Sequence, residues 1–345
     1  MDTLMRDCSS YWRGAVVYNR TEIILEAYPY EFTDIQKGRG VYICLCKDGS
    51  RKILKEFSGS ISKAELLDRF LKYLKERAGM AEQIVYTKEE QALFTDTDET
   101  RYYMRTWFEG RECDTRNRED ILCAVRKLAR FHMDVAGFEE PLPQMMTRTP
   151  DFLERECGRH TRELHKVRNY IMSKKKKNEF ETAFLNEYQY YLSQADDAVS
   201  RIQNMDKEPS GQYFGICHGD YSQHNLLFTA AGPVIINYER FCRDAYISDF
   251  AHFFRKIMEK HNWNTGLGMD LISAYDKVRK LARWELQQLA VRMVYPEKFW
   301  KVANHYFNSR KSWANNRDSE KLSKICAQEK ERTEFLKILS YFVQG

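Results

Sequence analysis

The residues best suited to chemistry lie in the stretch from Ile216 to Glu239, which reads ICHGDYSQHNLLFTAAGPVIINYE. A short apolar run leads into His218-Gly219-Asp220, and Asn225 follows Asp220 after four intervening residues. An aspartate on such a loop can accept the proton of a substrate hydroxyl, and an amide on the same loop can hold a metal ion against phosphate groups. The spacing therefore predicts phosphoryl transfer, with Asp220 as the base or hydroxyl-orienting residue and Asn225 as a metal ligand.

The second half of this stretch predicts a strand that carries further ligands. After the Gly232-Pro233 turn, the apolar run Val234-Ile235-Ile236 leads to Asn237 and Glu239, at one end of a predicted hairpin near residues 216–239. Phosphoryl transfer depends mainly on rigid positioning of charge. Asn237 and Glu239 are therefore candidate ligands of Mg²⁺.

Two neighbouring residues are candidates for a supporting role. His218 stands two residues before Asp220, and Asp249 begins a predicted helix over 249–258, for which Ser248 is the expected N-cap. Asp249 could hydrogen-bond back to the catalytic loop and brace it. An acidic residue in the first turn of a helix is equally explained by the helix dipole.

The N-terminal third predicts an antiparallel sheet over residues 32–57 with a tight turn at Asp48-Gly49. Before its first long strand lie Gly38 and Gly40, whose flexible backbone could bring N–H groups to phosphate oxygens, although a plain turn explains them as well. On the returning strand, Lys55 follows two apolar residues and is the candidate for binding nucleotide phosphates. Lys52 is its nearest competitor, and an edge-strand surface lysine is the alternative for Lys55.

The next elements complete the expected nucleotide site. Leucine and phenylalanine at three- and four-residue spacing predict a helix over residues 62–77. Glu65 near its start could pair with Lys55, or could simply favour the helix dipole. A strand over residues 101–108 ends in Trp107-Phe108-Glu109-Gly110. Here we expect a hinge, at which backbone groups would hold an adenine ring and Trp107 and Phe108 would line the nucleotide.

The C-terminal two thirds read as mostly helical. An amphipathic helix over 120–136 carries His132, which we expect to be a buried, hydrogen-bonded histidine and no ligand. A helical hairpin over 151–205 has Lys174-Lys175-Lys176-Lys177 at its turn, which is either a solvated turn or a contact for an acidic partner. Helices over 269–280, 284–294, 296–308 and 320–342 complete the chain. The architecture is therefore α+β, with a β-rich N-terminal lobe over residues 1–106 and a helical lobe over 107–345.

Composition narrows the functional class. The 345 residues suggest two lobes, and a net charge of +5 suits an anionic ligand without requiring nucleic acid. Nine scattered cysteines without a Cys-x2-Cys pair indicate reduced thiols, and the histidines lack zinc-ligand spacing. Neither a signal peptide nor a membrane-spanning segment is expected. We expect a nucleotide and a hydroxyl-bearing acceptor as partners, with no nucleic acid and no membrane.

These residues resemble the aminoglycoside phosphotransferase and choline kinase group of protein-kinase-like folds. More narrowly, nearly the whole chain is similar to the spore coat protein S (CotS) family. The blocks that carry this resemblance are Lys-Gly-Arg-Gly at 37–40, Ile-Leu-Lys-Glu at 53–56, Trp-Phe-Glu-Gly-Arg-Glu at 107–112, Cys-His-Gly-Asp-Tyr at 217–221, Asn-Tyr-Glu at 237–239, Phe-Phe-Arg-Lys at 253–256 and Tyr-Pro-Glu-Lys-Phe-Trp at 295–300. The resemblance implies a bilobal kinase-like fold and a cytoplasmic protein of the mother cell that is deposited in, or needed for, the spore coat, alongside other coat proteins.

One position departs from the pattern of active phosphotransferases, which have aspartate where this chain has Asn237. Mg²⁺ prefers carboxylate ligands, and a charge pair at 4 Å contributes up to roughly 4 kcal/mol at an effective dielectric constant near 20. Glu239 could supply the missing carboxylate. Two functions therefore stand: phosphotransfer from ATP or GTP with Mg²⁺ to a small molecule or coat component, or a pseudokinase that serves as a structural coat protein. Protein-kinase activity lacks support, because there is no Ala-Pro-Glu segment and Asn237 lies only 12 positions after Asn225.

Overall fold

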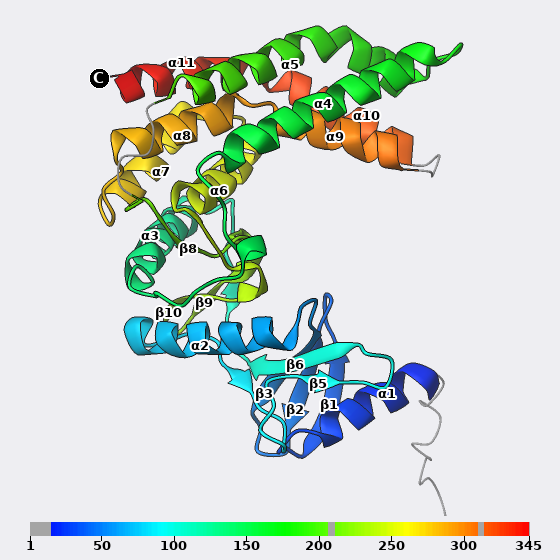
Figure 1. The fold of residues 1–345 in the computed structure, drawn as a ribbon, viewed down its shortest axis with the longest axis vertical. Coiled ribbons are helices and arrows are strands. Elements are labelled where there is room, and N and C mark those ends of the chain that lie inside the picture. Colours follow the sequence, from blue (N-terminus) through cyan, green and yellow to red (C-terminus); the bar gives the residue numbers. More distant parts are fainter. Residues whose placement is uncertain (1–14, 206–210, 310–313, 345) are drawn as a thin grey trace, which may run out of the picture. The chain divides into compact units, whose positions relative to one another are not determined.

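The computed structural model describes residues 15–205, 211–309 and 314–344 (Figure 1). The chain forms two compact units, and the predicted α+β class is confirmed. The first unit comprises Met1–Arg111 and Thr229–Glu239, and the second comprises Glu112–Phe228 and Arg240–Gly345. Residues 229–239, which carry Asn237 and Glu239, thus belong to the same unit as Lys55. Within the described residues, no helix has the length and apolar character needed to cross a membrane.

The first unit is built on an antiparallel sheet with the order β1-β2-β3-β6-β4, in which β5 also pairs with β6. Its elements are α1 (Ala15–Glu26), β1 (Phe32–Lys37), β2 (Tyr42–Cys46), β3 (Arg51–Glu56), α2 (Ile61–Ala78), β4 (Ile84–Val85), β5 (Phe94–Thr95) and β6 (Arg101–Thr106). Gly49 adopts a φ of 81°, which the tight β2–β3 turn requires and which glycine adopts without strain. The register pairs Lys55 of β3 with Tyr103 of β6, so both side chains leave the same face of the sheet.

Helix α2 forms where the apolar spacing predicts it. Ser60 caps its N-terminus by accepting the backbone N–H of Lys63, and Gly79 ends it with a φ of 73°. One face of the helix is buried: Ala64, Leu66, Leu67, Phe70, Leu71 and Leu74. The Phe70 ring packs edge-on against Tyr238, with centroids 5.6 Å apart, and this contact ties the helix to residues 229–239 within the first unit.

The second unit is mainly helical. Its helices are α3 (Arg118–Asp134), α4 (Phe152–Ser173), α5 (Glu179–Gln203), α6 (Ile247–Lys260), α7 (Thr265–Asp276), α8 (Arg283–Val294), α9 (Glu297–Asn308), α10 (Ala314–Ala327) and α11 (Glu329–Gln344). Strands β8 (Phe214–Cys217) and β11 (Cys242–Ala245) pair antiparallel, and β9 (Leu226–Thr229) and β10 (Gly232–Ile235) lie where the chain leaves this unit; β7 (Arg111–Glu112) marks its start. Helix α6 begins at Ile247, so the prediction that Ser248 caps it is wrong. The Ser248 hydroxyl instead accepts from Arg292 at 3.0 Å.

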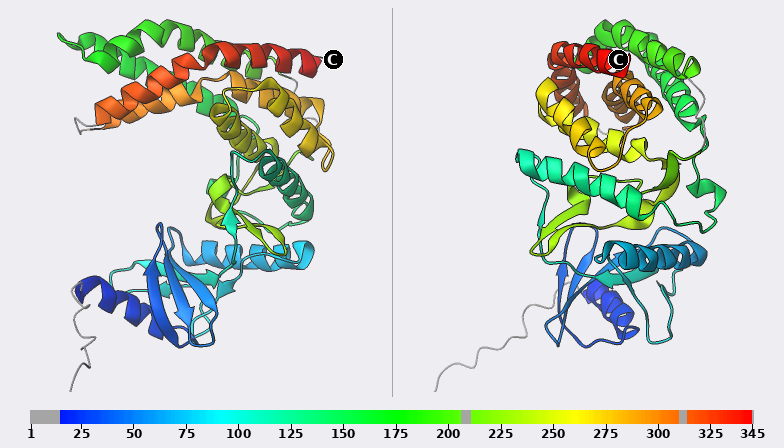
Figure 2. Two further views of the ribbon diagram at one scale, coloured as in Figure 1. Left: turned by 180° about the vertical axis from the view of Figure 1, so that it is seen from behind. Right: turned by 90° about the vertical axis from the view of Figure 1, so that its left-hand side faces the viewer.

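The predicted helical hairpin consists of α4 and α5, which lie side by side over α9 and α10 (Figures 1 and 2). Asn178 and Glu181 form a reciprocal capping box at the start of α5. Lys174 in the tetralysine turn contacts the buried Glu181 at 2.5 Å, so at least this lysine has a structural role. Four aromatic rings of α5 face the core of the unit: Phe180, Phe184, Tyr188 and Tyr191 pack with Phe299 and Tyr306 of α9.

A stacked pair joins this hairpin to α9. The imidazole of His160 lies 3.4 Å from the Trp300 ring, centroid to centroid, with an angle of 19° between the planes. Only 6% of His160 is exposed. Burial, reinforced by the positive charge of Arg159, lowers the pKa of His160 to about 4.

This shift predicts that acid weakens the fold. The unfolded chain binds a proton at His160 near pH 6.5, whereas the folded protein does not until about pH 4, so the stabilisation present at neutral pH is lost as the pH falls between these values. Between pH 7 and pH 5 we expect this group alone to lower the free energy of unfolding by about 1–2 kcal/mol. His160→Phe retains a ring against Trp300 and should flatten that part of the pH profile in chemical denaturation. An identical pH dependence in the variant would contradict the assignment.

Candidate active site

The loop with Asp220 begins where β8 ends. Cys217, the last residue of β8, lies opposite Cys242 of β11 in the antiparallel strand register, and both are free thiols. The chain then turns sharply at Gly219, which has a φ of 76°. A Cβ atom at Gly219 would lie 2.1 Å from the backbone oxygen of Arg240, so no other residue fits without moving the backbone. The His218-Gly219-Asp220 motif therefore has a steric reason for its glycine, which also determines where the chain presents Asp220.

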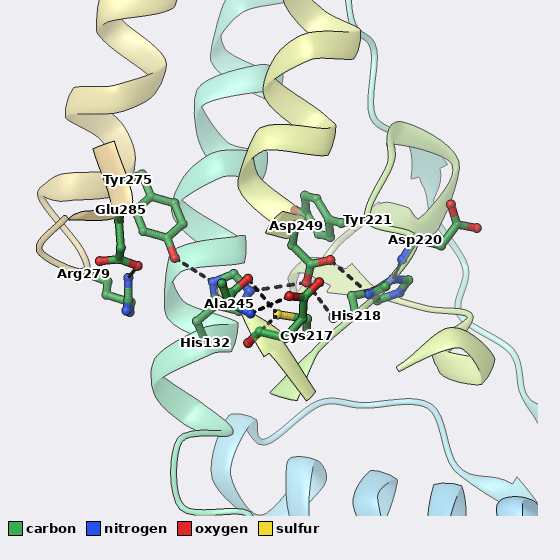
Figure 3. Close-up of polar contacts among 12 residues, drawn as sticks. His132, Cys217, His218, Asp220, Tyr221, Ala245, Asp249, Tyr275, Arg279 and Glu285 are labelled. Carbon is green, nitrogen blue, oxygen red and sulfur yellow. Dashed lines mark hydrogen bonds and ion pairs between the residues drawn. The ribbon is translucent and has the colours of Figure 1, made fainter. Parts of the chain in front are cut away.

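Asp249 of α6 anchors this turn through hydrogen bonds to its backbone. Its carboxylate accepts the backbone N–H groups of His218 at 2.6 Å and of Gly219 at 3.0 Å (Figure 3). These are the contacts expected of a brace for the catalytic loop. Asp249 is only 3% exposed, and although burial alone would raise its pKa, the hydrogen bonds and charges of His132 and His218 lower the pKa overall. The loop is thus anchored by a buried anion that receives two backbone donors.

His132 of α3 completes the network below Asp249. Its Nε2 lies 3.3 Å from Asp249 Oδ2 and its Nδ1 lies 2.6 Å from the Tyr275 hydroxyl, so both ring nitrogens have partners. Ligand atoms of His132, Cys217 and Asp249 lie within 4.8 Å of one another. Burial, however, raises the pKa of Cys217 well above its usual value, and the thiol faces the Ala245 carbonyl at 3.5 Å. The cluster is a hydrogen-bond network, which fits the prediction for His132, and its donors do not suit a metal ion.

Asp220 and Asn225 lie on the loop that this network supports. The half-buried Asp220 carboxylate points away from the Asp249 network (Figure 3). Asn225 donates its side-chain amide N–H to the Asp220 backbone oxygen at 2.8 Å, and the residue is buried. The Tyr221 hydroxyl donates to the Ala124 carbonyl at 2.7 Å, which ties the loop to α3. The loop is therefore held on both sides of Asp220, whose carboxylate is directed outward.

In the first unit, Lys55 meets Glu239. Lys55 Nζ lies 2.6 Å from Glu239 Oε1, and the same oxygen accepts the Tyr103 hydroxyl. Burial would raise the pKa of Glu239, but the ammonium group of Lys55 outweighs it and keeps the carboxylate ionised. Burial and the Glu239 charge raise the pKa of Tyr103 well above its usual value, so this phenol remains a proton donor. The role of Lys55 in binding nucleotide phosphates remains a prediction, and it would require this pair to separate.

Next to this pair lies a buried network that the sequence analysis missed. Arg105 of β6 contacts Glu82 through Nη1 at 2.7 Å and the Asn237 side-chain oxygen through Nη2 at 2.8 Å. Glu82 also accepts the backbone N–H groups of Asn237 at 3.0 Å and Tyr238 at 3.2 Å. Glu82 and Arg105 are 1% and 5% exposed. The only sequence signals were an acid between α2 and β4 and an arginine among the apolar residues of β6, and neither stands out from an ordinary surface charge.

These contacts test whether the candidate ligands of this unit suit Mg²⁺. The Asn237 oxygen faces a guanidinium group, which does not favour the amide as a metal ligand. Glu239 is ionised and half-buried, and its present partner Lys55 has a flexible side chain, so this carboxylate does suit a hard cation. Asn237 adopts a φ of 67°, a left-handed conformation that asparagine and aspartate tolerate better than most residues.

Other predicted site residues lie elsewhere in the first unit. Lys55 pairs with Glu239 and not with Glu65. Glu65 is exposed on α2 and lies beyond its first turn, so the alternative interpretation as a first-turn acid is not supported either. Gly38 and Gly40 form a turn in which the Gly38 N–H donates to Val41 O. The Trp107 indole donates to Glu109 at 3.1 Å. The roles of Gly38, Gly40, Trp107 and Phe108 in binding a nucleotide remain predictions.

The fold has clear counterparts among solved structures. An aminoglycoside phosphotransferase from Alicyclobacillus acidocaldarius superposes with a TM-score of 0.80, 18% identity, and coverage of 94% of this chain and 96% of that one. Amicoumacin kinase hAmiN, in complex with AMP-PNP, Ca²⁺ and Ami, superposes with a TM-score of 0.61 and 13% identity over 92% of this chain and 94% of its own. At these identities the likeness concerns the fold. Together with the loop geometry, it defines a kinase-like fold of the aminoglycoside phosphotransferase type.

The sequence itself identifies the family. Residues 21–339 match the family described as "Spore coat putative kinase YutH", and the chain belongs to it. Spore coat protein S of Bacillus subtilis (strain 168) is 21% identical over 163 residues, a match that spans 46% of this chain and 46% of that protein. The chain thus matches about half the length of this curated relative. The predicted membership of a CotS-like spore coat family with a phosphotransferase fold is confirmed.

The Glu82–Arg105 pair generates a stability prediction. Glu82→Gln would remove the carboxylate that pairs directly with the buried Arg105 guanidinium, so we expect a loss of about 3 kcal/mol in the free energy of unfolding. The measurement is chemical denaturation.

The matched control is Glu31→Gln. Glu31 pairs with Lys47 at 2.6 Å, but both side chains are largely exposed, so its loss should change stability by less than about 1 kcal/mol. Equal effects of the two variants would show that the buried pair is not special.

Proposed function

We propose that the protein is an ATP-dependent phosphotransferase of the spore coat that transfers a phosphoryl group to a hydroxyl acceptor. The observation that carries this proposal is the loop at Asp220, which is turned by a sterically required glycine and anchored by the two backbone hydrogen bonds to Asp249. A fold held this firmly around one outward carboxylate suits a reaction that depends on positioning.

The proposed roles follow from the contacts in each unit. Asp220 would accept the proton of the acceptor hydroxyl, or orient that hydroxyl, with His218 and Asp249 holding the loop. Lys55 would move from Glu239 to the nucleotide phosphates, since a charged phosphate competes well for an ammonium group. The candidate Mg²⁺ ligand of the first unit is Glu239, once released, and that of the second unit is Asn225; Mg²⁺ would neutralise charge on the transferred group. The nucleotide is ATP or GTP, and hAmiN, the relative with AMP-PNP, supports a nucleotide ligand.

A second candidate function is favoured by one specific contact. Arg105 takes the amide oxygen of Asn237 and places a fixed cation where a metal ligand is expected. In that case the protein would bind nucleotide with little metal dependence and serve as a structural or morphogenetic coat component. Under either candidate the protein would act in the cytoplasm of the mother cell or in the coat, and its partners would include other coat proteins.

Substitution of Asp220 separates an effect on catalysis from an effect on nucleotide binding. Asp220→Asn removes the proton-accepting charge while preserving the shape of the side chain, so we expect turnover of ATP to fall by a factor of at least about 10² with nucleotide affinity nearly unchanged. The measurement is single-turnover phosphoryl transfer with a library of hydroxyl compounds and coat extracts as acceptors.

The control for this experiment is Asp196→Asn, which removes an exposed carboxylate on α5 of the same unit and should leave turnover unchanged. Full turnover in Asp220→Asn would remove this residue from its role. Turnover absent from the wild type with every acceptor would favour the structural candidate.

Thermal melting with ATP, with and without Mg²⁺, decides between the two candidates. A ligand at 100 times its dissociation constant adds about 2.7 kcal/mol to the free energy of unfolding. For the phosphotransferase we expect a stabilisation by ATP that grows with Mg²⁺ and grows further in Asn237→Asp, because the new carboxylate attracts the cation. Stabilisation by ATP that ignores Mg²⁺ in both proteins would favour the nucleotide-binding scaffold, and no stabilisation at all would reject both.

A further inference from the structure

A cavity of about 350 Å³ opens in the second unit beside the catalytic loop. Its walls come from α4, α6, α8 and α9, and Cys217, Gly219 and Asp249 form the side next to the loop. Gly219 directly precedes Asp220, so the cavity lies next to the residue proposed to receive the acceptor hydroxyl. Its volume is in the range of pockets that hold small metabolites.

Five basic side chains line this cavity against four acidic ones. The basic residues are Arg148, Arg159, Arg255, Arg292 and Lys301, and the acidic residues are Glu156, Asp244, Asp249 and Glu297. The cavity thus contains many charges of both signs. Whether it prefers an anionic or a cationic ligand depends on which of these charges already have partners.

Most of the acidic charge is already neutralised. Asp249 accepts the backbone of the catalytic loop. Glu297 pairs with Arg255 and, at 2.5 Å, with Lys301, and although burial opposes ionisation, these cations lower its pKa to about 2. Asp244 accepts the backbone N–H of Ala245 at 2.7 Å, and burial raises its pKa. Glu156 is the one acid of the lining for which the described residues provide no partner.

Two arginines retain their binding capacity. Arg148 forms no ion pair within the described residues; its guanidinium lies over the Phe152 ring at 4.2 Å. Arg292 likewise makes no direct ion pair there, although its charge acts on the Asp244 carboxylate and opposes the burial that raises the pKa of Asp244. It donates to the Ser248 hydroxyl at 3.0 Å, and its Nε has no hydrogen-bond partner in that part of the chain. Arginine is well suited to bind oxyanions, because its planar guanidinium donates two parallel hydrogen bonds.

The pKa values of two neighbouring side chains, His252 and Lys256, are lowered in part by the positive charges around the cavity. Burial together with the charges of Lys256, Arg255 and Lys301 lowers the pKa of His252, which lines the cavity, to about 4. Burial also lowers the pKa of Lys256; the Asp220 carboxylate opposes this shift, and Lys301 and Arg255 add to it. Lys256 therefore lies within the fields of both Asp220 and the cations of the cavity, which links the positive region to the catalytic loop.

We propose that this cavity receives the phosphate acceptor and that the acceptor is a small hydroxylated molecule with an oxyanion group, a carboxylate or a phosphate, held by Arg148 and Arg292. This proposal deepens the proposed function. The role of the bound molecule as phosphate acceptor rests on that function, whereas binding of an oxyanion in the cavity requires no turnover. The hydroxyl of such a molecule would extend past Gly219 toward Asp220.

The test measures binding of inorganic phosphate and of malonate by calorimetry to the full chain. All measurements use a Lys55→Met background, so that the nucleotide-phosphate lysine makes no contribution. Phosphate and malonate distinguish a phosphate-bearing from a carboxylate-bearing acceptor, and ethanolamine serves as the cationic probe. We expect one or both anions to bind and ethanolamine not to bind.

The variant Arg148→Gln/Arg292→Gln removes both arginine charges and should weaken anion binding at least about tenfold, as expected for the loss of charge-assisted hydrogen bonds. Arg283→Gln is the matched control, since it removes an exposed arginine at the other end of the helix that carries Arg292, outside the cavity. Its affinity should equal that of the parent protein. Undetectable anion binding in the parent, equal affinity in all variants, or preference for ethanolamine would each overturn the proposal, whereas a lack of ATP turnover alone would not.

Discussion

The constraint on which the second unit depends is the burial of a single carboxylate under a backbone turn. Asp249 lies in the first turn of α6, and its carboxylate accepts hydrogen bonds from the backbone N–H groups of His218 and Gly219, the two residues before Asp220. A buried anion is costly unless it is satisfied, so α6, the loop and His132 must be present together. The position of Asp220, the proposed base, follows from this arrangement, because a side chain at position 219 would clash with the Arg240 backbone.

The first unit also contains a buried carboxylate, that of Glu82, which is satisfied by a guanidinium group in addition to backbone N–H groups. Glu82 is almost fully buried, yet it accepts two backbone N–H groups and a guanidinium, so each of its oxygens is used. This fixes residues 237–238 against β6, and from there Glu239 reaches Lys55 and Tyr103. The segment 229–239 is thereby held in the first unit by specific polar contacts in addition to the packing of Tyr238 on Phe70. Networks of buried, hydrogen-bonded polar groups specify one arrangement more strictly than apolar packing does.

Sequence reasoning predicted the parts that follow local rules. Apolar spacing predicts α2 and the α4–α5 hairpin, and the Asp-x4-Asn loop with Asp249 follows from residue type and order. The errors concern long-range partners: Lys55 pairs across 184 positions with Glu239 and not with the nearby Glu65. Glu82 and Arg105 were missed because burial of a charge depends on the tertiary fold and leaves no periodic pattern. Ser248 was misread because Tyr246 precedes the helix without a side-chain cap, while the serine hydroxyl accepts from Arg292.

The contacts of Asn237 show what its substitution for aspartate changes. The backbone at this position is left-handed, which both residues tolerate, and the Glu82–Arg105 pair beside it is already neutral. A carboxylate at position 237 would bond to Arg105 as the amide does, so the fold does not require asparagine. The difference is one negative charge, which would attract a metal ion but would share its charge with a buried guanidinium. With asparagine there, Glu239 is the remaining carboxylate of this unit's candidate ligands, and it cannot bind a cation fully while Lys55 holds it. In the proposed function, release of Glu239 and capture of phosphate by Lys55 would therefore be coupled, because a nucleotide that takes Lys55 would leave Glu239 able to hold a cation.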